Sequence, residues 1–148
     1  MWCHAQPDCQ TAIDRRRDAQ AVGPSVPRAE ALAAAKRPPV YPIEVVALVD
    51  TGASTTCIDP SVAHALGLTM TGCLDLKTVS AGAVPVRAAR YDIQVLFPWS
   101  PPFSIAPEMP VVATDLTHLG VQALLGRDVL SRCLLVWNGP EDSMTFAF

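Results

Sequence analysis

The fold of this chain is decided by the stretch Ala47-Leu48-Val49-Asp50-Thr51-Gly52-Ala53-Ser54. Five consecutive apolar residues, 45–49, lead directly into the carboxylate of Asp50. Such a run is typical of a strand that is buried on both faces, whereas an aspartate is almost never fully buried without a partner. Gly52 permits a tight turn, and the two small residues after it let other backbone approach closely. The pattern predicts a buried strand that presents Asp50 at the floor of a cleft.

The composition favours a single, mainly β domain. The chain has 148 residues, of which 50% are hydrophobic and 17% are charged. A chain of this length buries roughly two thirds of its unfolded surface, so it can fold without disulfides. Its 14 prolines are more than a helical bundle would tolerate. We expect residues 1–22 to form a solvated leader or a frayed helix, and residues 23–148 to form the domain.

The charges exclude several classes of partner. The net charge is −3, without the basic face that nucleic acid or an anionic membrane requires. No apolar run approaches the roughly 18 residues that span a bilayer, so we expect a cytoplasmic protein. The five cysteines are odd in number and have no paired spacing, which favours free thiols. Cys3, His4 and Cys9 fit no common zinc spacing, so we expect no metal site.

Several elements can be placed along the chain from local signals. The alanine-rich segment Arg28–Lys36 has high helix propensity but few large apolar residues, so it predicts a short surface helix. Prolines then lead into a strand over Ile43–Val49. A second strand is expected at Thr55–Ile58. A short helix should follow, because Asp59 precedes a proline as a helix cap does, and Gly67 can end that helix in a left-handed conformation.

The second half of the chain reads as hairpins. Strand-like runs at Leu76–Ser80 and Val84–Val95 are joined by Ala81-Gly82-Ala83, which predicts a hairpin with its turn at the glycine. The prolines of Pro98–Pro110 should break the sheet before a short buried strand at Met109–Ala113.

The chain should end in a further hairpin. This hairpin begins with a strand at Leu134–Trp137 and ends with a terminal strand in which Met144, Phe146 and Phe148 alternate with smaller residues. Three large apolar side chains on one face must be covered, so we expect this strand to be paired within the chain or across an interface.

A second motif follows the first, Ala123-Leu124-Leu125-Gly126-Arg127-Asp128-Val129-Leu130. With Asp50-Thr51-Gly52-Ala53, it resembles the retroviral-type, or retropepsin-like, aspartic peptidases. That family has an apolar strand followed by Asp-Thr-Gly-Ala, and later an apolar pair followed by Gly-Arg-Asp and a short helix. The two motifs occur here in the same order and with suitable spacing. The resemblance implies a cellular or bacterial single-domain member, with a closed acid protease barrel, mainly β, and one or two short helices.

The resemblance also implies a mechanism. Asp50 would supply one carboxylate of a catalytic pair that hydrolyses peptide bonds in a peptide or protein substrate. Two carboxylates a few ångströms apart share one proton, so one can activate water while the other protonates the carbonyl oxygen. No metal or cofactor is needed. Because the sequence holds a single Asp-Thr-Gly, the second acid must come from another copy of the chain, in a two-fold homodimer.

Further roles follow from the same resemblance. Thr51 would hydrogen-bond across the two-fold axis, Gly52 would shape the turn, and Ala53 and Ser54 would complete the active-site loop. Retroviral enzymes usually carry a further acid at the position of Ser54, where it pairs with the motif's arginine, so here that arginine must find another partner. The residues expected to support the site are Leu125, Gly126, Arg127 and Asp128. The tip of a flap that covers the substrate is expected at Ser80, Ala81, Gly82 and Ala83.

Other functions are less consistent with the residues. Asp50-Thr51-Gly52 also looks like the phosphate loop of actin-like ATPases, but those need two large α/β lobes. No Gly-x-Ser-x-Gly elbow of a serine hydrolase is present. Cys57 and Cys133 read as small core residues and His64 as a surface residue. A non-catalytic, dimeric peptide-binding or scaffold module on the same fold remains the alternative. A carboxylate at a dimer axis is costly unless it is used, which favours the peptidase.

Overall fold

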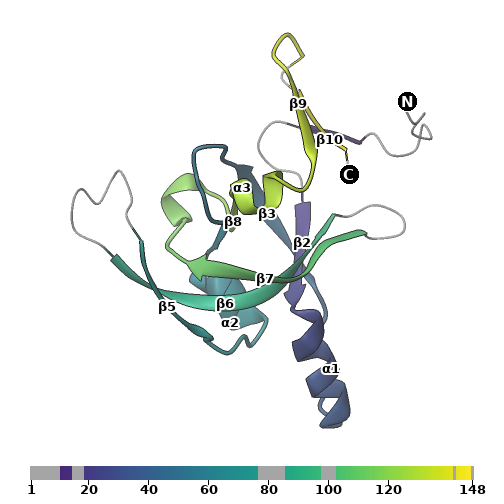
Figure 1. The fold of residues 1–148 in the computed structure, drawn as a ribbon, viewed down its shortest axis with the longest axis vertical. Coiled ribbons are helices and arrows are strands. Elements are labelled where there is room, and N and C mark those ends of the chain that lie inside the picture. The colour runs from purple at the N-terminus through teal and green to yellow at the C-terminus, as the bar shows by residue number, and fades with distance from the viewer. Residues whose placement is uncertain (1–10, 15–18, 77–85, 98–102, 142, 148) are drawn as a thin grey trace.

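The computed structural model describes residues 11–14, 19–76, 86–97, 103–141 and 143–147. Seven strands form one sheet in the order β2-β3-β8-β4-β7-β6-β5, and β2 also pairs with β6. This extra pairing closes six of the strands into a barrel, with β5 outside the ring (Figure 1). The strands are β2 (Ala19–Pro24), β3 (Ile43–Val49), β4 (Cys57–Ile58), β5 (Gly72–Leu76), β6 (Val86–Phe97), β7 (Phe103–Ala113) and β8 (Ala123–Leu125).

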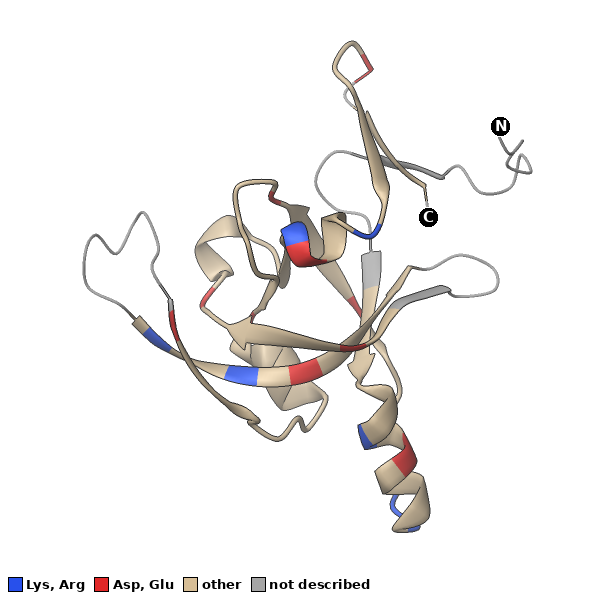
Figure 2. Cartoon of the chain, viewed as in Figure 1, with Lys and Arg blue, Asp and Glu red and all other residues tan. Residues whose placement is uncertain are grey.

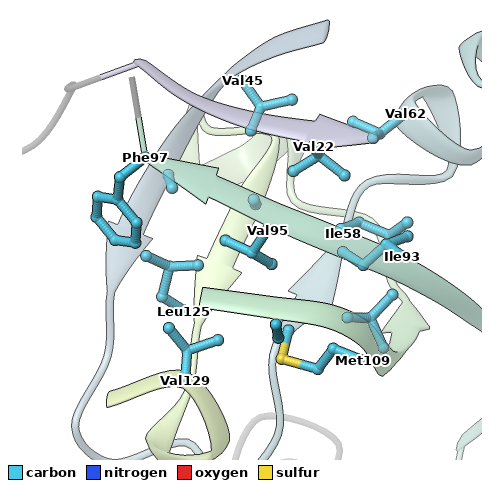
Figure 3. Close-up of a cluster of buried hydrophobic side chains, with 14 of the residues drawn as sticks. Val22, Val45, Ile58, Val62, Ile93, Val95, Phe97, Met109, Leu125 and Val129 are labelled. Atoms are coloured by element: carbon cyan, nitrogen blue, oxygen red, sulfur yellow. The ribbon is translucent and has the colours of Figure 1, made fainter. Parts of the chain in front are cut away.

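The interior of the barrel is filled from alternating positions of its strands. On β6, Ile93, Val95 and Phe97 are fully buried, whereas their neighbours are partly exposed, as the period of two predicts. Val45 and Leu125 point into the same cluster from β3 and β8 (Figure 3). Each such side chain contributes about 1.5 to 3 kcal/mol when it is removed from water. The barrel core therefore fixes the ends of β3 and β8, where the two sequence motifs begin.

A smaller sheet covers one end of the barrel core. It has the order β1-β10-β9, formed by β1 (Thr11–Asp14), β9 (Leu134–Asn138) and β10 (Ser143–Ala147). Met144 and Phe146 of β10 are buried, and the Phe146 ring lies 5.5 Å from that of Phe97 between centroids. The terminal strand is thus paired within the chain and packs its apolar face against the barrel, as its alternation predicts; Phe148 lies outside the described residues.

Helices occupy the surface of the barrel. The predicted surface helix is α1 (Val26–Ala34), which has no buried residue and projects from the barrel (Figure 1). It is anchored by Arg28, whose Nη2 donates to the Gly67 carbonyl at 2.6 Å. The other helices are α2 (Pro60–Ala65), a 3-10 turn η3 (Thr117–Leu119) and α3 (Arg127–Leu130). Among the described helices, none has the length and hydropathy needed to cross a membrane.

The start and end of α2 follow the sequence signals. Asp59 is its N-cap, and Oδ1 accepts hydrogen bonds from Ser61 N at 2.9 Å and Ser61 Oγ at 2.6 Å. Oδ2 accepts from Leu116 N at 3.1 Å. These bonds, those from Ser61 above all, lower the pKa of the carboxyl group. Gly67 follows the helix with a φ of 55°, a conformation that glycine adopts without a steric penalty.

The prediction of a leader over residues 1–22 is wrong for the two segments of it that the structure describes. Thr11–Asp14 pairs with β10, and β2 pairs with both β3 and β6, so neither segment is a solvated leader or a frayed helix. Val22 is buried in the barrel core. The expected boundary at residue 22 falls inside β2. Residues 19–22 carry one large apolar side chain, so their strand conformation depends on the partner strands rather than on their own pattern.

The expected break at the prolines is also wrong in part. Strand β7 runs without interruption through Pro107 and Pro110. The pairing of β7 with β6 shifts register between Ile93 and Val95, so Pro107 falls at an irregularity where no ladder bond is required of it. On its other side β7 pairs with β4 only at Val112 and Ala113, which leaves Pro110 on a free edge.

The second strand of the predicted central hairpin is confirmed as β6, but its partner β5 ends at Leu76, where the predicted first strand, Leu76–Ser80, begins. The rest of that predicted strand lies outside the described residues. β5 and β6 are antiparallel, with Leu76 opposite Val86. The predicted flap tip, Ser80–Ala83, lies outside the described residues, as do Cys3, His4 and Cys9.

Candidate functional site

The two sequence motifs meet where β3 and β8 end. These strands are parallel neighbours, with Val49 opposite Leu125. The Asp50 N–H continues the ladder by donating to the Leu125 carbonyl at 3.0 Å. The loop that begins at Asp50 and the turn at Gly126 therefore lie side by side, although Leu125 is 75 positions after Asp50 in the chain. Both were predicted site elements, and the fold brings them together.

Asp50 is held by its own loop. Its Oδ1 accepts hydrogen bonds from Gly52 N at 2.8 Å and from Ala53 N at 3.2 Å. Its Oδ2 accepts none from the part of the chain that the structure describes. The side chain is half-buried, and Thr51, Gly52 and Ser54 around it are exposed. Among the described residues, the carboxylate is thus held through one oxygen only.

A buried threonine joins the two motifs. Thr56 Oγ1 accepts from Gly126 N at 3.0 Å and donates to Asp128 Oδ1 at 2.6 Å. Asp128 Oδ2 accepts from Thr56 N at 2.8 Å, and Oδ1 also accepts from Val129 N at 2.9 Å. Sequence reasoning missed Thr56. Its position two residues before Ile58 places it on the same face of the strand as that apolar residue. A hydroxyl buried on that face requires hydrogen-bond partners, and this was the available signal.

Gly126 makes this close approach possible. A Cβ at this position would lie 2.7 Å from the carbonyl carbon of Thr55 and 2.8 Å from its oxygen. Both are backbone atoms, so no side chain can move aside to relieve the contact. The β8 end and the Asp50 loop can touch only because residue 126 is glycine.

Arg127 clamps the other side of the loop. Its backbone N donates to the Ala53 carbonyl at 2.9 Å. Its Nη1 donates to the carbonyl oxygens of Thr51 and Gly52, at 3.1 Å each. Three consecutive carbonyls of the loop are therefore held by one residue of the second motif.

A row of half-buried side chains lies beside the loop. Leu48, Leu124 and Cys57 are cross-strand neighbours on the face of the sheet opposite the barrel core. Cys57 was expected in the core but is only half-buried. Its burial, and next the negative charges of Asp128 and Asp50, raise the pKa of its thiol to about 11. The thiol is therefore protonated at neutral pH, so it serves as an apolar surface rather than as a nucleophile.

The remaining titratable residues form no second centre in the described segments. His64 is exposed on α2, and Cys133 is half-buried against the core, where burial raises its pKa. No group of three or more His, Cys, Asp or Glu side chains among the described residues is arranged to hold a metal ion.

Comparisons with known proteins agree with this geometry. Residues 43–129, from the first residue of β3 into α3, match the family model for aspartyl proteases. The chain belongs to the aspartyl protease family. No curated protein matches its sequence significantly. Among solved structures, a retropepsin-like aspartic protease from Rickettsia conorii superposes with a TM-score of 0.55 at 17% identity. The alignment covers 100% of this chain and 98% of that one, which confirms the predicted retropepsin-like fold.

Proposed function

We propose that this member of the aspartyl protease family is an endopeptidase whose active site contains two copies of Asp50, one from each subunit of a homodimer. The observation that carries the proposal is the state of the Asp50 carboxylate. One oxygen is fixed by Gly52 and Ala53, and the other has no hydrogen-bond partner among the described residues. A carboxylate held in this way is oriented for proton transfer.

The need for a second copy follows from the neighbouring acids. Asp128 belongs to the same pair of motifs, but both of its oxygens accept hydrogen bonds from Thr56, and one of them also from Val129. It therefore braces the loop and is not free to act as the second acid. A two-fold axis beside the exposed Thr51 and Gly52 would bring the two Asp50 side chains together.

The reaction then needs one proton shared by two carboxylates. The ionised Asp50 takes a proton from water, whose oxygen attacks the peptide carbonyl carbon. The protonated Asp50 donates its proton to the carbonyl oxygen. The Asp50 that took the water proton then gives it to the amide nitrogen, the other Asp50 takes a proton back from a hydroxyl of the tetrahedral intermediate, and the C–N bond breaks to release the amine and the carboxylic acid. The β5–β6 hairpin would act as the flap over the bound peptide, with the half-buried Leu48, Leu124 and Cys57 accepting apolar side chains.

The decisive test compares Asp50→Asn with Glu30→Gln, which removes a carboxylate from the exposed helix α1. A peptide library is digested with each variant and the products are identified by mass spectrometry. Asp50→Asn should lower the cleavage rate by at least about 10²-fold without changing the circular dichroism or the dimer mass, whereas Glu30→Gln should cleave normally. Cleavage by Asp50→Asn at the rate of the Glu30→Gln variant would refute the mechanism. Binding of peptides without cleavage by the natural chain would instead favour a non-catalytic peptide-binding module.

Dilution tests the shared site separately. Because each active site needs two chains, specific activity should fall as the dimer dissociates. Sedimentation at the same concentrations reports the fraction of dimer. Activity that stays constant in a fully monomeric sample would exclude a site built from two subunits.

A further inference from the structure

Arg127 holds a positive charge beside the Asp50 loop with part of its guanidinium unused. The side chain is exposed, and its Nη1 donates to the carbonyls of Thr51 and Gly52. The guanidinium carries five N–H donors in a planar fork. Nε and Nη2, which together form one bidentate edge, donate to none of the described residues. The group is therefore oriented by the loop and still able to bind a carboxylate.

Apart from Asp50, to which the proposed function gives a catalytic role, the acids that could neutralise this charge are occupied or missing. Asp128 uses both oxygens on Thr56 and Val129. Ser54 is neutral and exposed. It follows Ala53, whose carbonyl accepts a hydrogen bond from the Arg127 backbone N–H. Within the described ranges, no carboxylate forms an ion pair with Arg127.

A second cation lies close by. Arg132, between α3 and β9, is exposed, and its Nε donates to the backbone carbonyl of Asp128 at 3.3 Å. No described carboxylate forms an ion pair with it either. Figure 2 shows a basic segment next to an acidic one on α3, and a further basic segment just before the β9–β10 hairpin. The carboxylate of Asp128 is used on Thr56 and Val129, so the two guanidinium groups lie at this edge of the site without an ion-pair partner among the described residues.

We infer that Arg127 binds an acidic side chain of the substrate and makes the peptidase prefer peptides with Asp or Glu near the scissile bond. This inference rests on the proposed function. Arg127 contacts Thr51 and Gly52, the two residues that follow Asp50. An extended peptide advances about 3.3 Å per residue, so its second or third residue from the scissile bond would pass the guanidinium. A two-fold dimer has one Arg127 on each side, so the preference appears at mirror-related positions of the peptide.

The test measures kcat/KM for peptides with a fixed apolar scissile pair. Glu is placed in turn at each of the neighbouring positions, and each peptide is matched by one with Gln there. The Glu:Gln ratio should reach roughly three- to tenfold at two mirror-related positions, mainly through a lower KM, and should fall at high salt. Arg127→Gln should bring the ratio to about one, whereas the matched variant Arg132→Gln should keep most of it.

A second variant keeps the inference testable if Arg127→Gln does not fold. Ser54→Asp adds a carboxylate to the loop itself, which should occupy Arg127 and remove the Glu preference. An unchanged ratio in Ser54→Asp would overturn the inference, as would a ratio of one at every position in the natural chain. A third outcome is a ratio of one at every position in the natural chain together with a dimer that dissociates in Arg127→Gln. In that case Arg127 binds a carboxylate of the partner subunit and not one of the substrate. Failure of the natural chain to cleave any peptide would contradict the proposed function itself.

Discussion

Two aspartates, Asp50 and Asp59, each follow a strand that pairs with β8, and each accepts a hydrogen bond from the backbone N–H two residues later. Asp59 is buried, and both of its oxygens have partners, one of them the distant Leu116 N–H. Asp50 is half-buried and uses only one oxygen on the described chain. The same local turn thus stabilises the fold when both carboxylate oxygens accept hydrogen bonds. When one oxygen has no partner, the same turn can present a carboxylate to a substrate.

The largest effect should separate these two roles. Asp50→Asn should lower kcat by about 10²- to 10⁴-fold while leaving the thermal midpoint almost unchanged, because it removes the acid and base but keeps the shape of the loop. Asp59→Ala should do the reverse, lowering the free energy of unfolding by about 1 kcal/mol and leaving the kcat of the folded protein intact. Both quantities are measured on both variants. If Asp59→Ala lost activity without losing stability, the division of roles would be wrong.

Next in size is the dependence of the Asp50 loop on the second motif. Gly126→Ala places a methyl group against the Thr55 backbone and should cost about 1 to 3 kcal/mol of unfolding free energy, with reduced activity in the protein that remains folded. Gly72→Ala is the matched control, because a Cβ there meets nothing within 4 Å. Chemical denaturation of both variants provides the measurement. Equal midpoints would show that the loop and β8 can separate at little cost.

The smallest effect is the pH dependence that Asp59 contributes. Its pKa in the folded state lies below the usual 3.8, so the unfolded chain binds the proton more tightly. The stabilisation that the ionised Asp59 contributes is complete above the usual pKa. It is lost as the pH falls through the lowered pKa of the folded state. Asp59→Asn keeps the cap but cannot titrate, so the difference in stability between it and the natural chain should shrink on acidification. Urea unfolding from about pH 5 to pH 2 measures this; a constant difference would contradict it.

Much of the site could be predicted because its signals are local. The apolar run that ends at Asp50 gives the bounds of β3 directly, and the apolar pair before Gly126 marks the end of β8 in the same way. The cap of α2 was equally clear from Asp59. These features depend on neighbours in sequence, which a single chain displays.

Features that depend on distant partners were not predictable in this way. β2 has little apolar pattern of its own and is a strand because β3 and β6 leave a gap between them. β7 continues through Pro107 because a register shift on β6 accommodates it. Thr56 reads as one polar residue among several, and its role appears only when Gly126 and Asp128 are brought against it. The position of the flap tip and the role of each site residue stay predictions.

The closure of the barrel by β2 limits how the N-terminal end of this chain can be trimmed. Residues 19–24 fill the gap between β3 and β6, so their removal would expose two long strands with unpaired backbone groups, a surface that promotes aggregation. A maturation cleavage that preserves the barrel must therefore fall before Ala19. The same limit applies to the design of shortened versions for crystallisation, where cutting at residue 22 would remove part of the wall that supports Asp50.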